Sequence, residues 1–398
     1  MPDTAQVMDA EDEQLMLDAI EKWLEQKVRP VVMQLEHDNE YPAALVEDMK
    51  ELGLFGALID TEYGGLGLTA TLYAKIVTKI AEEWMSLTGI FNSHLMMAQI
   101  VQRFGTDAQK TYWLPKFASG EIRGGLALTE PNAGTDLQAI TTRATRKGDK
   151  YVVTGAKTWI SNAIEGSCVA LLVKTDPAAS PRYNGISILI TPTKTNPETG
   201  EKLKGVSNGR KLEKLGYKGI DSGELIYDEY EWDAELCLVG GKEGEGFFMA
   251  TGGLEIGRIN IAARSVGIAR RALRESVAYS QIRKTMGKPI CEHQAIQLKL
   301  GEMATKTRAA ELLVEDAARA YDTGARIDME AGMAKYFASE TALEVATEAM
   351  RIHGGYGYSK EYPIERLYRD APLMCIGEGT NEMQRIIISK QLVKRNPV

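Results

Sequence analysis

Residues 128–136 read LTEPNAGTD, and a block far downstream, between residues 354 and 380, contains GGYG, RD and IGEGT. The first stretch predicts a turn-rich loop whose carboxylates, threonines and backbone amides could face an anion or a ring. The second block adds a glycine cluster where the backbone could approach a phosphate, and a glutamate, Glu378, held between two glycines. A surface turn is the usual explanation for either block alone, so the remainder of the chain has to decide.

Length and composition restrict the class of protein. A chain of 398 residues with 44% apolar and 26% charged residues is typical of a globular protein with two or three packed domains. The net charge of −8 and the scattered Lys and Arg residues argue against a nucleic-acid surface. The four cysteines lie far apart without CxxC spacing, and the histidines show no ligand spacing, so we expect neither disulfides nor a metal site.

The N-terminal residues and the apolar runs indicate whether the protein is secreted or enters a membrane. Residues 1–13 are acidic and lack an apolar core, so they do not match a secretory signal. The longest apolar runs, such as Cys168–Val173, have the length of strands, so we expect no membrane contact. The sequence predicts a soluble, cytoplasmic protein.

Three textures follow one another along the chain. From Asp12 to Ser119 apolar residues recur at a helical period, with a break at Arg29-Pro30 and a glycine-rich turn at residues 62–67. From Gly124 to Val239 short β-rich runs alternate with turns, and we expect strands at residues 151–155, 169–173, 186–190 and 225–227. This pattern favours a compact β-barrel or sandwich.

Long helices return after residue 240. Apolar faces predict one helix over residues 259–277 and another over 296–317. A third is expected at 328–352, ending at Gly354, and a fourth from about Thr380, whose hydroxyl could cap it, with Glu382 in its first turn. Four such helices predict a bundle.

The two motif blocks, in this order, resemble the acyl-CoA dehydrogenase family, and the resemblance runs from about Asp12 to the C-terminus. It implies an α+β fold with an N-terminal helical domain at 1–123, a middle β-barrel or sandwich domain at 124–239 and a C-terminal four-helix bundle domain at 240–398. It further implies FAD as cofactor, an acyl-CoA substrate, an electron-transfer flavoprotein as partner, and self-association as a homotetramer or a dimer.

The resemblance assigns the catalytic base to Glu378. The base removes a proton α to the thioester carbonyl while the β-hydrogen leaves as hydride to the flavin. Its backbone N–H would help to bond the thioester oxygen, and a bound acyl chain would expel water and raise the pKa of Glu378. Some relatives place the base on the first bundle helix; the matching position here is Gly257, and Glu255 lies on a different helical face.

Two sets of residues match the family's FAD contacts. The loop and strand positions would hold the ring, with the Trp159 indole against it; they are Leu126, Leu128, Thr129, Gly134, Thr135, Trp159, Ile160 and Ser161. The second set matches segments that reach FAD across a subunit interface; its members are Arg283, Thr285, His293, Gln294, Arg351, Gly354 and Gly355. Thr380 and Glu382, at the start of the last expected helix, are further expected FAD contacts. An arginine suits a pyrophosphate because its planar fork donates twice. Arg351 departs from the family, which carries glutamine there, so this contact is in doubt.

Substrate contacts are expected from Thr135, Glu255, Arg258 and Gly379. Relatives commonly carry an aromatic residue where this chain has Gly377, so we expect extra space beside the thioester or acyl group, unless Gly377 serves a backbone with positive φ. The segment Ser86–Gln102, which would line the far end of the pocket, has no Lys or Arg. An acyl group ending in a carboxylate therefore has no obvious partner there, which disfavours a glutaryl-type substrate unless a cation comes from elsewhere.

These matches predict FAD-dependent dehydrogenation of an acyl-CoA to a trans-2-enoyl-CoA. One alternative is a flavin oxidase or monooxygenase on the same fold. Another is a flavin-binding assembly protein without turnover, because a fold alone does not imply a function.

Overall fold

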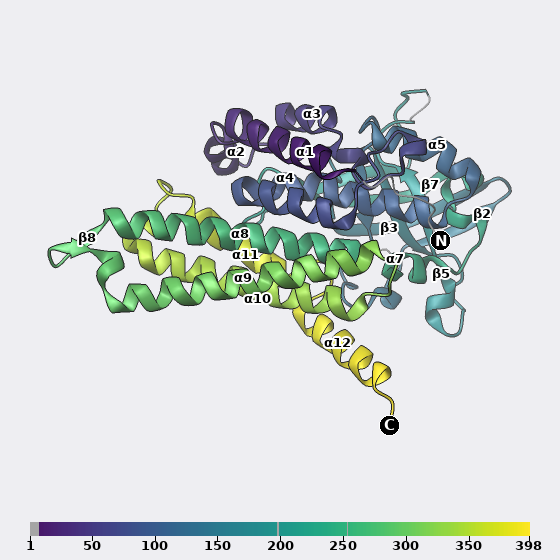
Figure 1. The fold of residues 1–398 in the computed structure, drawn as a ribbon. Coiled ribbons are helices and arrows are strands. Elements are labelled where there is room, and N and C mark those ends of the chain that lie inside the picture. Colours follow the sequence, from purple (N-terminus) through teal and green to yellow (C-terminus); the bar gives the residue numbers. More distant parts are fainter. Residues whose placement is uncertain (1–7, 197–198, 253) are drawn as a thin grey trace.

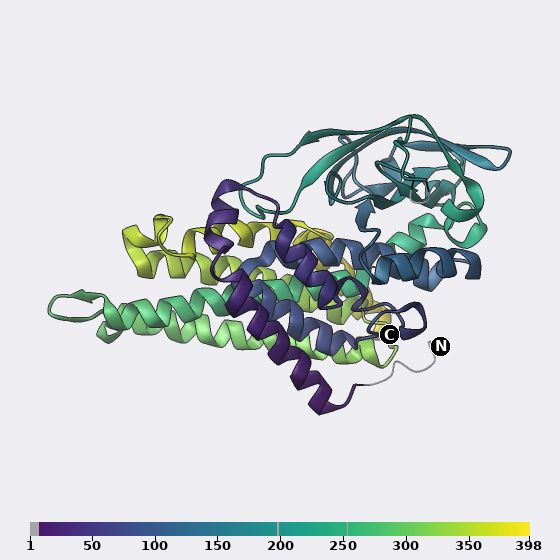
Figure 2. The same cartoon turned by 90° about the horizontal axis from the view of Figure 1, so that it is seen from above.

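The computed structural model describes residues 8–196, 199–252 and 254–398. An N-terminal group of helices, a β-sheet and a long helical bundle lie against one another, with the sheet at one end of the elongated molecule (Figure 1 and Figure 2). Helix α4, Ala70–Phe104, joins the three parts because it contacts both helix α8 of the bundle and strand β1 of the sheet. Its central stretch is buried from Ser86 to Asn92.

The N-terminal helices form where the periodicity predicts them. Ile20, Leu24 and Val28 are buried as expected, whereas Leu15 is exposed. The first helical stretch ends in a turn at residues 29–31, and the glycine-rich segment at residues 62–67 contains a turn. The helices are α1 (Ala10–Trp23), the π-helix Leu24–Val28, α2 (Val32–Asp38), α3 (Ala43–Glu51), α4 and α5 (Asp107–Ala118).

The middle region is one curled seven-stranded sheet in the order β1-β4-β2-β3-β7-β6, with β5 paired to β4. Strand β4 is buried on both faces: Ala170 and Leu172 join a core with α4 and α5, whereas Leu171 and Val173 join a core enclosed by β3 and β7. All four predicted strands are confirmed. The strands are β1 (Gly124–Ala127), β2 (Arg143–Lys147), β3 (Lys150–Ser161), β4 (Cys168–Lys174), β5 (Ile186–Pro192), β6 (Val206–Lys211) and β7 (Ser222–Asp233).

The C-terminal region is helical. Short helices α6 (Ala234–Cys237) and α7 (Gly246–Gly252) precede α8 (Leu254–Ile282), α9 (Gln294–Asp322), α10 (Asp328–His353), α11 (Ile364–Ile376) and α12 (Asn381–Arg395), and a small hairpin of β8 (Lys284–Thr285) and β9 (Lys288–Pro289) joins α8 to α9. Within the described ranges, no helix combines the length and the apolar character needed to cross a membrane.

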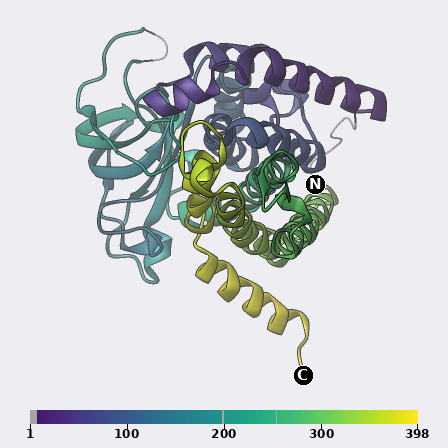
Figure 3. The ribbon, with the colours of Figure 1, turned by 90° about the vertical axis from the view of Figure 1, so that its left-hand side faces the viewer.

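The sequence analysis was wrong about the fourth helix of the bundle. That helix is α11, which packs against α8 and α10, whereas the helix capped by Thr380, α12, contacts α10 and projects from the body (Figure 1 and Figure 3). Helix α11 has the expected apolar spacing, with Ile364, Leu367 and Met374 buried, but Pro372 within it is typical of a break. Helix α10 ends at Gly354 as expected, with a positive φ of 59°, but the ψ of −132° is outside the left-handed helical region that a left-handed cap would adopt.

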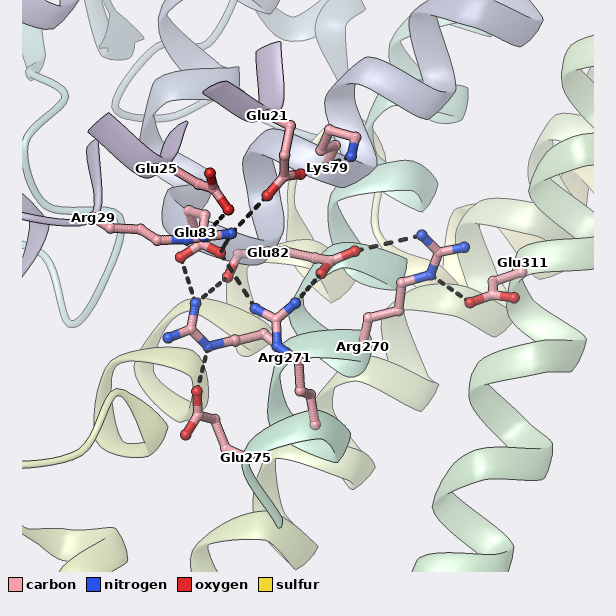
Figure 4. Close-up of polar contacts among 11 residues, drawn as sticks. Glu21, Glu25, Arg29, Lys79, Glu82, Glu83, Arg270, Arg271, Glu275 and Glu311 are labelled. Carbon is pink, nitrogen blue, oxygen red and sulfur yellow. Dashed lines mark hydrogen bonds and ion pairs between the residues drawn. The ribbon is translucent and has the colours of Figure 1, made fainter. Parts of the chain in front are cut away.

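A cluster of charged side chains fastens the N-terminal helices to the bundle (Figure 4). Glu83 is almost completely buried at a kink of α4, where Trp84 leaves helical geometry, and its carboxylate meets Arg29, Arg271 and Arg274. Burial alone would raise the pKa of Glu83, but Arg271 and Arg29 lower it below its ordinary value. The cluster therefore fixes α4, on which the candidate site is built, against α8.

Candidate active site

Glu378 lies in the short loop between α11 and α12 and reaches into the space between α4 and α8. Its Oε1 accepts a hydrogen bond from Asn92 Nδ2 of α4 at 3.1 Å. Its Oε2 is buried and has no hydrogen-bond partner among the described residues. The backbone of Glu378 has a φ of 54°, which is rare for a residue with a side chain and is typical of functional sites.

Gly257 of α8 faces the same carboxylate. A Cβ atom at this position would lie 1.9 Å from Glu378 Oε2 and 3.1 Å from Met96 Sδ, so the carboxylate occupies the space that a side chain at 257 would need. This places Gly257 directly beside Glu378. Glu255, in contrast, interacts with Asp328 and with the charges of Arg103 and Arg258.

The environment of Glu378 favours its neutral form. Burial raises the pKa of the Glu378 carboxyl above its ordinary value, against the opposing charge of Arg264 and the hydrogen bond from Asn92. A carboxylate with a raised pKa and an unpartnered oxygen is a stronger base than an exposed glutamate, which suits proton abstraction.

A buried polar network extends from Asn92. Tyr73 Oη donates to Asn92 Oδ1 at 3.0 Å and accepts from Asn260 Nδ2 at 2.8 Å. The network therefore fixes the amide of Asn92 so that its NH₂ group points at Glu378. Sequence analysis did not identify Tyr73, Asn92 or Asn260, because each lies on a helix whose periodicity marks only the apolar face.

The loop that carries Glu378 is held at both ends by one buried side chain. Lys335 Nζ of α10 donates to the Cys375 carbonyl at 3.2 Å and to Asn381 Oδ1 at 2.8 Å. Burial lowers the pKa of Lys335 to about 8. Thr380 caps α12 by accepting from the Met383 amide at 3.4 Å, as the sequence predicts, and Gly379 adopts a φ of 86°.

The first set of predicted flavin residues lies in β1, in the loop that follows β1 and at the end of β3, and β1 packs against α4. The Thr158 amide donates to the Thr129 carbonyl at 2.9 Å, which brings the loop at 128–136 against the end of β3. The side chain of Trp159 is 59% exposed, so its indole forms an open aromatic surface. The backbone of Trp159 has a φ of 61°, which is a strained conformation for a residue with a side chain. Leu126, Leu128, Thr129 and Ser161 are half-buried around it, and Gly134 and Thr135 are exposed; the side chain of Ile160 is buried in the core, so only its backbone is available.

A buried ion pair supports this loop. Lys157 Nζ donates to Glu130 at 2.9 Å and to the Leu128 carbonyl at 3.0 Å, and Glu130 also accepts from the amides of Thr141 and Thr142. Burial opposes the charge on Glu130, but Lys157 and these donors lower its pKa to about 2. Glu130 therefore shapes the loop, and the run of polar residues around it is partly structural.

Part of the second set of predicted flavin residues surrounds a pocket of about 670 Å³ at the opposite end of the bundle. Arg283, Thr285, His293, Gly354 and Gly355 line it. His293 Nε2 and Thr285 Oγ1 are hydrogen-bonded at 3.0 Å, and a Cβ atom at Gly354 or Gly355 would meet nothing within 4 Å. The packing of this chain therefore leaves room for a ligand to approach both glycines.

Other predicted residues lie outside these two groups. Arg351 is exposed and pairs with Glu348, and Glu382 is exposed and pairs with Arg385. Gln294 is exposed at the start of α9. Arg258 is buried, not superficial, with Asp328 at 3.9 Å and with two nitrogens that have no hydrogen-bond partner among the described residues.

One group of possible metal ligands exists among the described residues, although the sequence shows no ligand spacing. It consists of Glu36, His37 and Glu365. Arg369 already donates to Glu36 at 2.7 Å and to Glu365 at 2.6 Å. The group is thus an ion-pair cluster between α2 and α11.

The order of helical, β and helical regions, together with a buried carboxylate on the loop before α12 and an exposed tryptophan at the end of β3, is typical of the acyl-CoA dehydrogenases. The chain belongs to the acyl-CoA dehydrogenase family. Its residues match the family's N-terminal domain at 10–121, the middle domain at 125–230 and the C-terminal domain at 244–393. The chain is therefore an oxidoreductase of the acyl-CoA dehydrogenase type, from a flavin-dependent family.

Similar proteins span nearly the whole chain. The 3-(aryl)acrylate reductase of Clostridium sporogenes is 37% identical over 96% of this chain and 99% of its own length. The mitochondrial short-chain specific acyl-CoA dehydrogenase of Bos taurus is 37% identical, over 96% and 90% respectively. A solved structure described for the electron transferring flavoprotein of Acidaminococcus fermentans is 36% identical with a TM-score of 0.91, and the match covers 97% of this chain and 100% of that chain.

Proposed function

We propose that this protein binds FAD and converts an acyl-CoA into the trans-2-enoyl-CoA, with Glu378 as the base. The observation that carries the proposal is the Oε2 atom of Glu378, which is buried, has no partner among the described residues and faces Gly257 of α8. A carboxylate in this state has one lone-pair direction free for a substrate proton.

The residues of this chain divide the work of the reaction. Glu378 takes the proton from the α-carbon, and its own backbone N–H donates to the thioester oxygen, on which negative charge develops. Asn92 orients the carboxylate through Oε1 and leaves Oε2 for the proton. Bound FAD would supply the acceptor for the hydride that leaves the β-carbon. Trp159, Thr129 and Ser161 would hold the ring system, and Arg258 would orient the CoA portion.

The two sets of flavin residues lie at opposite ends of one chain. Strand β8, which carries Thr285, is at the end of the bundle farthest from the sheet that carries Trp159 (Figure 1 and Figure 2). One FAD cannot touch both sets within one chain, which supports a site completed by a second copy, as in a homotetramer or a dimer. Arg283, His293, Gly354 and Gly355 would then hold the phosphate and adenine parts of the partner's FAD.

The electron acceptor and the direction of the reaction are part of the proposal. The match to a structure described for an electron transferring flavoprotein supports such a protein as the acceptor. The similarity to a 3-(aryl)acrylate reductase favours one alternative, in which the same residues return the proton and hydride to an unsaturated acyl group. An oxidase on the same fold is a further alternative.

An anaerobic absorbance titration tests the proposal. The purified yellow protein should release FAD on acid precipitation, and a saturated acyl-CoA should bleach the flavin bands. Rapid re-oxidation by air would instead identify an oxidase, and bleaching only by a reductant followed by recovery with an enoyl-CoA would identify a reductase. A folded protein that takes up no FAD, or holds FAD that none of a panel of acyl-CoAs or enoyl-CoAs affects, would refute the proposal.

A further inference from the structure

Arg264 of α8 is a buried cation without a buried anion bound to it. Its side chain is only 2% exposed, and it donates to two neutral oxygens, Tyr217 Oη at 3.2 Å and the Thr88 carbonyl at 3.2 Å. Its Nε has no hydrogen-bond partner among the described residues, and it forms no direct ion pair there; its charge acts at longer range on the Glu378 carboxyl. A charge left unpaired away from water is costly, so such an arginine calls for a ligand.

Arg264 lies on the same face of α8 as the residues that surround Glu378. Gly257, Asn260 and Arg264 follow one another at i, i+3 and i+7, so their side-chain positions form one stripe. On α4, Thr88 beside Arg264 is one helical turn, roughly 6 Å, from Asn92 beside Glu378. The guanidinium is therefore about one turn of helix away from the base, along the contact between α4 and α8.

The surroundings of Arg264 and Glu378 are polar as well as buried. Tyr73 and Asn260 lie on the Glu378 side, and the Tyr217 hydroxyl lies so close to α4 that a Cβ atom at Gly89 would be 1.6 Å from it. An apolar acyl tail that ended here would gain no partner for Arg264. A tail that ended in a carboxylate would supply the missing counter-ion through charge-assisted hydrogen bonds.

We propose that Arg264 receives the terminal carboxylate of a short ω-carboxyacyl-CoA, such as a glutaryl or methyl-substituted succinyl thioester. The inference rests on the proposed function, because it places the acyl group beside Glu378. It also corrects the expectation from α4: that helix carries no cation between Ser86 and Gln102, but α8 supplies one. A substrate carboxylate on Arg264 would neutralise the charge that opposes the raised pKa of Glu378, and would make Glu378 a stronger base only when this substrate is bound.

The test compares two acyl-CoAs of the same chain length with the holoenzyme and a dye as electron acceptor. Wild-type protein should use glutaryl-CoA at least about tenfold better than pentanoyl-CoA in kcat/KM, since the two differ in the carboxylate. Arg264→Gln should remove this preference, and Arg264→Lys should keep part of it. Arg270→Gln is the matched control, because Arg270 lies on the same helix but pairs with Glu311 and Glu82 at the surface, and it should leave the ratio unchanged.

The ratio of the two kcat/KM values does not depend on how much of the enzyme is folded. The ratio measured for the wild-type protein therefore tests the proposal even if a variant fails to fold. If both substrates bleach the flavin and pentanoyl-CoA is used as well as glutaryl-CoA, the proposed function holds and the role of Arg264 is refuted. Equal losses for both substrates in Arg264→Gln would refute it too, and would make Arg264 a residue that tunes Glu378. If no acyl-CoA bleaches the flavin, the proposed function itself fails.

Discussion

Replacing Gly257 by alanine should separate catalysis from folding. A Cβ atom at this position would lie 1.9 Å from Glu378 Oε2 and 2.9 Å from its Cδ. Since non-bonded carbon atoms approach one another to about 3.5 Å, the carboxylate has to move by more than roughly 1 Å. A displacement of this size can cost about 10²-fold in rate, and we expect a loss of that order in kcat.

The same change should leave the protein stable. The atom that has to move is the end of a flexible side chain, and alanine is favoured over glycine inside a helix by up to about 1 kcal/mol. Gly257→Ala should therefore retain FAD, and its melting temperature should equal or exceed that of the wild type. Gly301→Ala is the matched control, because Gly301 is in the middle of α9 with nothing within 4 Å of an added Cβ, and its turnover should not change.

Stopped-flow reduction of the flavin by substrate measures the chemical step directly. A rate for Gly257→Ala within a few-fold of both the wild type and Gly301→Ala would refute the reasoning, because Glu378 could not then act from beside Gly257. A stronger form of the test places a carboxylate on α8. In a Glu378→Gly background, Gly257→Glu should restore part of the reduction rate, since its side chain starts from the space that Glu378 has left.

Three further predictions concern the base, its neighbour and the charged cluster. Glu378→Gln should keep the flavin but lower turnover by about 10²–10⁴-fold, and it should abolish the acidic limb of the kcat/KM–pH profile, whose inflection in the wild type should lie above the ordinary pKa of a glutamate because burial raises it. Gly377→Tyr should lower kcat/KM for a ring-bearing acyl-CoA by more than about tenfold relative to a straight one, because Gly377 has an ordinary φ of −67° and an added Cβ would meet only the Leu373 carbonyl at 3.4 Å; equal losses would refute the idea of a wide pocket. Glu83→Gln should destabilise the protein by about 3 kcal/mol, the low end for a broken buried pair because Arg29 and Arg274 are partly exposed, and calorimetry with Glu315→Gln as the control should show it. Because the pKa of Glu83 is lowered on folding, its stabilisation is present at neutral pH and is lost as the pH falls through that pKa, so the difference from the wild type should shrink in acid.

The sequence predicted the elements whose residues signal their own structure. Apolar periodicity located α8, α9 and α10, and β-branched runs located β3, β4, β5 and β7, because each pattern is contained within a few turns or residues. Helix α11 was missed, since Pro372 imitates a helix end. The strands β1, β2 and β6 were missed as well; β1 is glycine-rich, and β2 and β6 are polar and partly exposed, so none carries an alternating apolar signal.

Some residues of the candidate site could be predicted from a local motif, and others could not. A motif marked Glu378, but its partner Asn92 is 286 residues away in sequence, and Asn260 is 187 residues from Tyr73. No local pattern can report a pair so distant. Lys335 was equally hidden, because a lysine on a helix usually extends into water, whereas here it donates to the two ends of the loop that carries Glu378.

The polar stripe of α8 shows why the sequence of one helix cannot reveal which of its polar residues are buried. On an isolated helix, Gly257, Asn260 and Arg264 lie opposite Ile259, Ala262 and Val266, so the usual interpretation assigns the stripe to solvent. In the folded chain α4 covers it, and Asn260 and Arg264 are both buried. Burying such groups opposes folding unless each finds a partner, and the partners that the described residues offer satisfy Asn260 Nδ2 but leave Asn260 Oδ1, Arg264 Nε and Glu378 Oε2 without one. The Arg264 and Glu378 atoms differ in what they can bind, an anion for the guanidinium and a proton for the carboxylate, and they lie about one helical turn apart. A single acyl group with an acidic α-proton and a carboxylate at its far end would satisfy both at once, so the proposed base and the proposed substrate class depend on the same contact between α4 and α8.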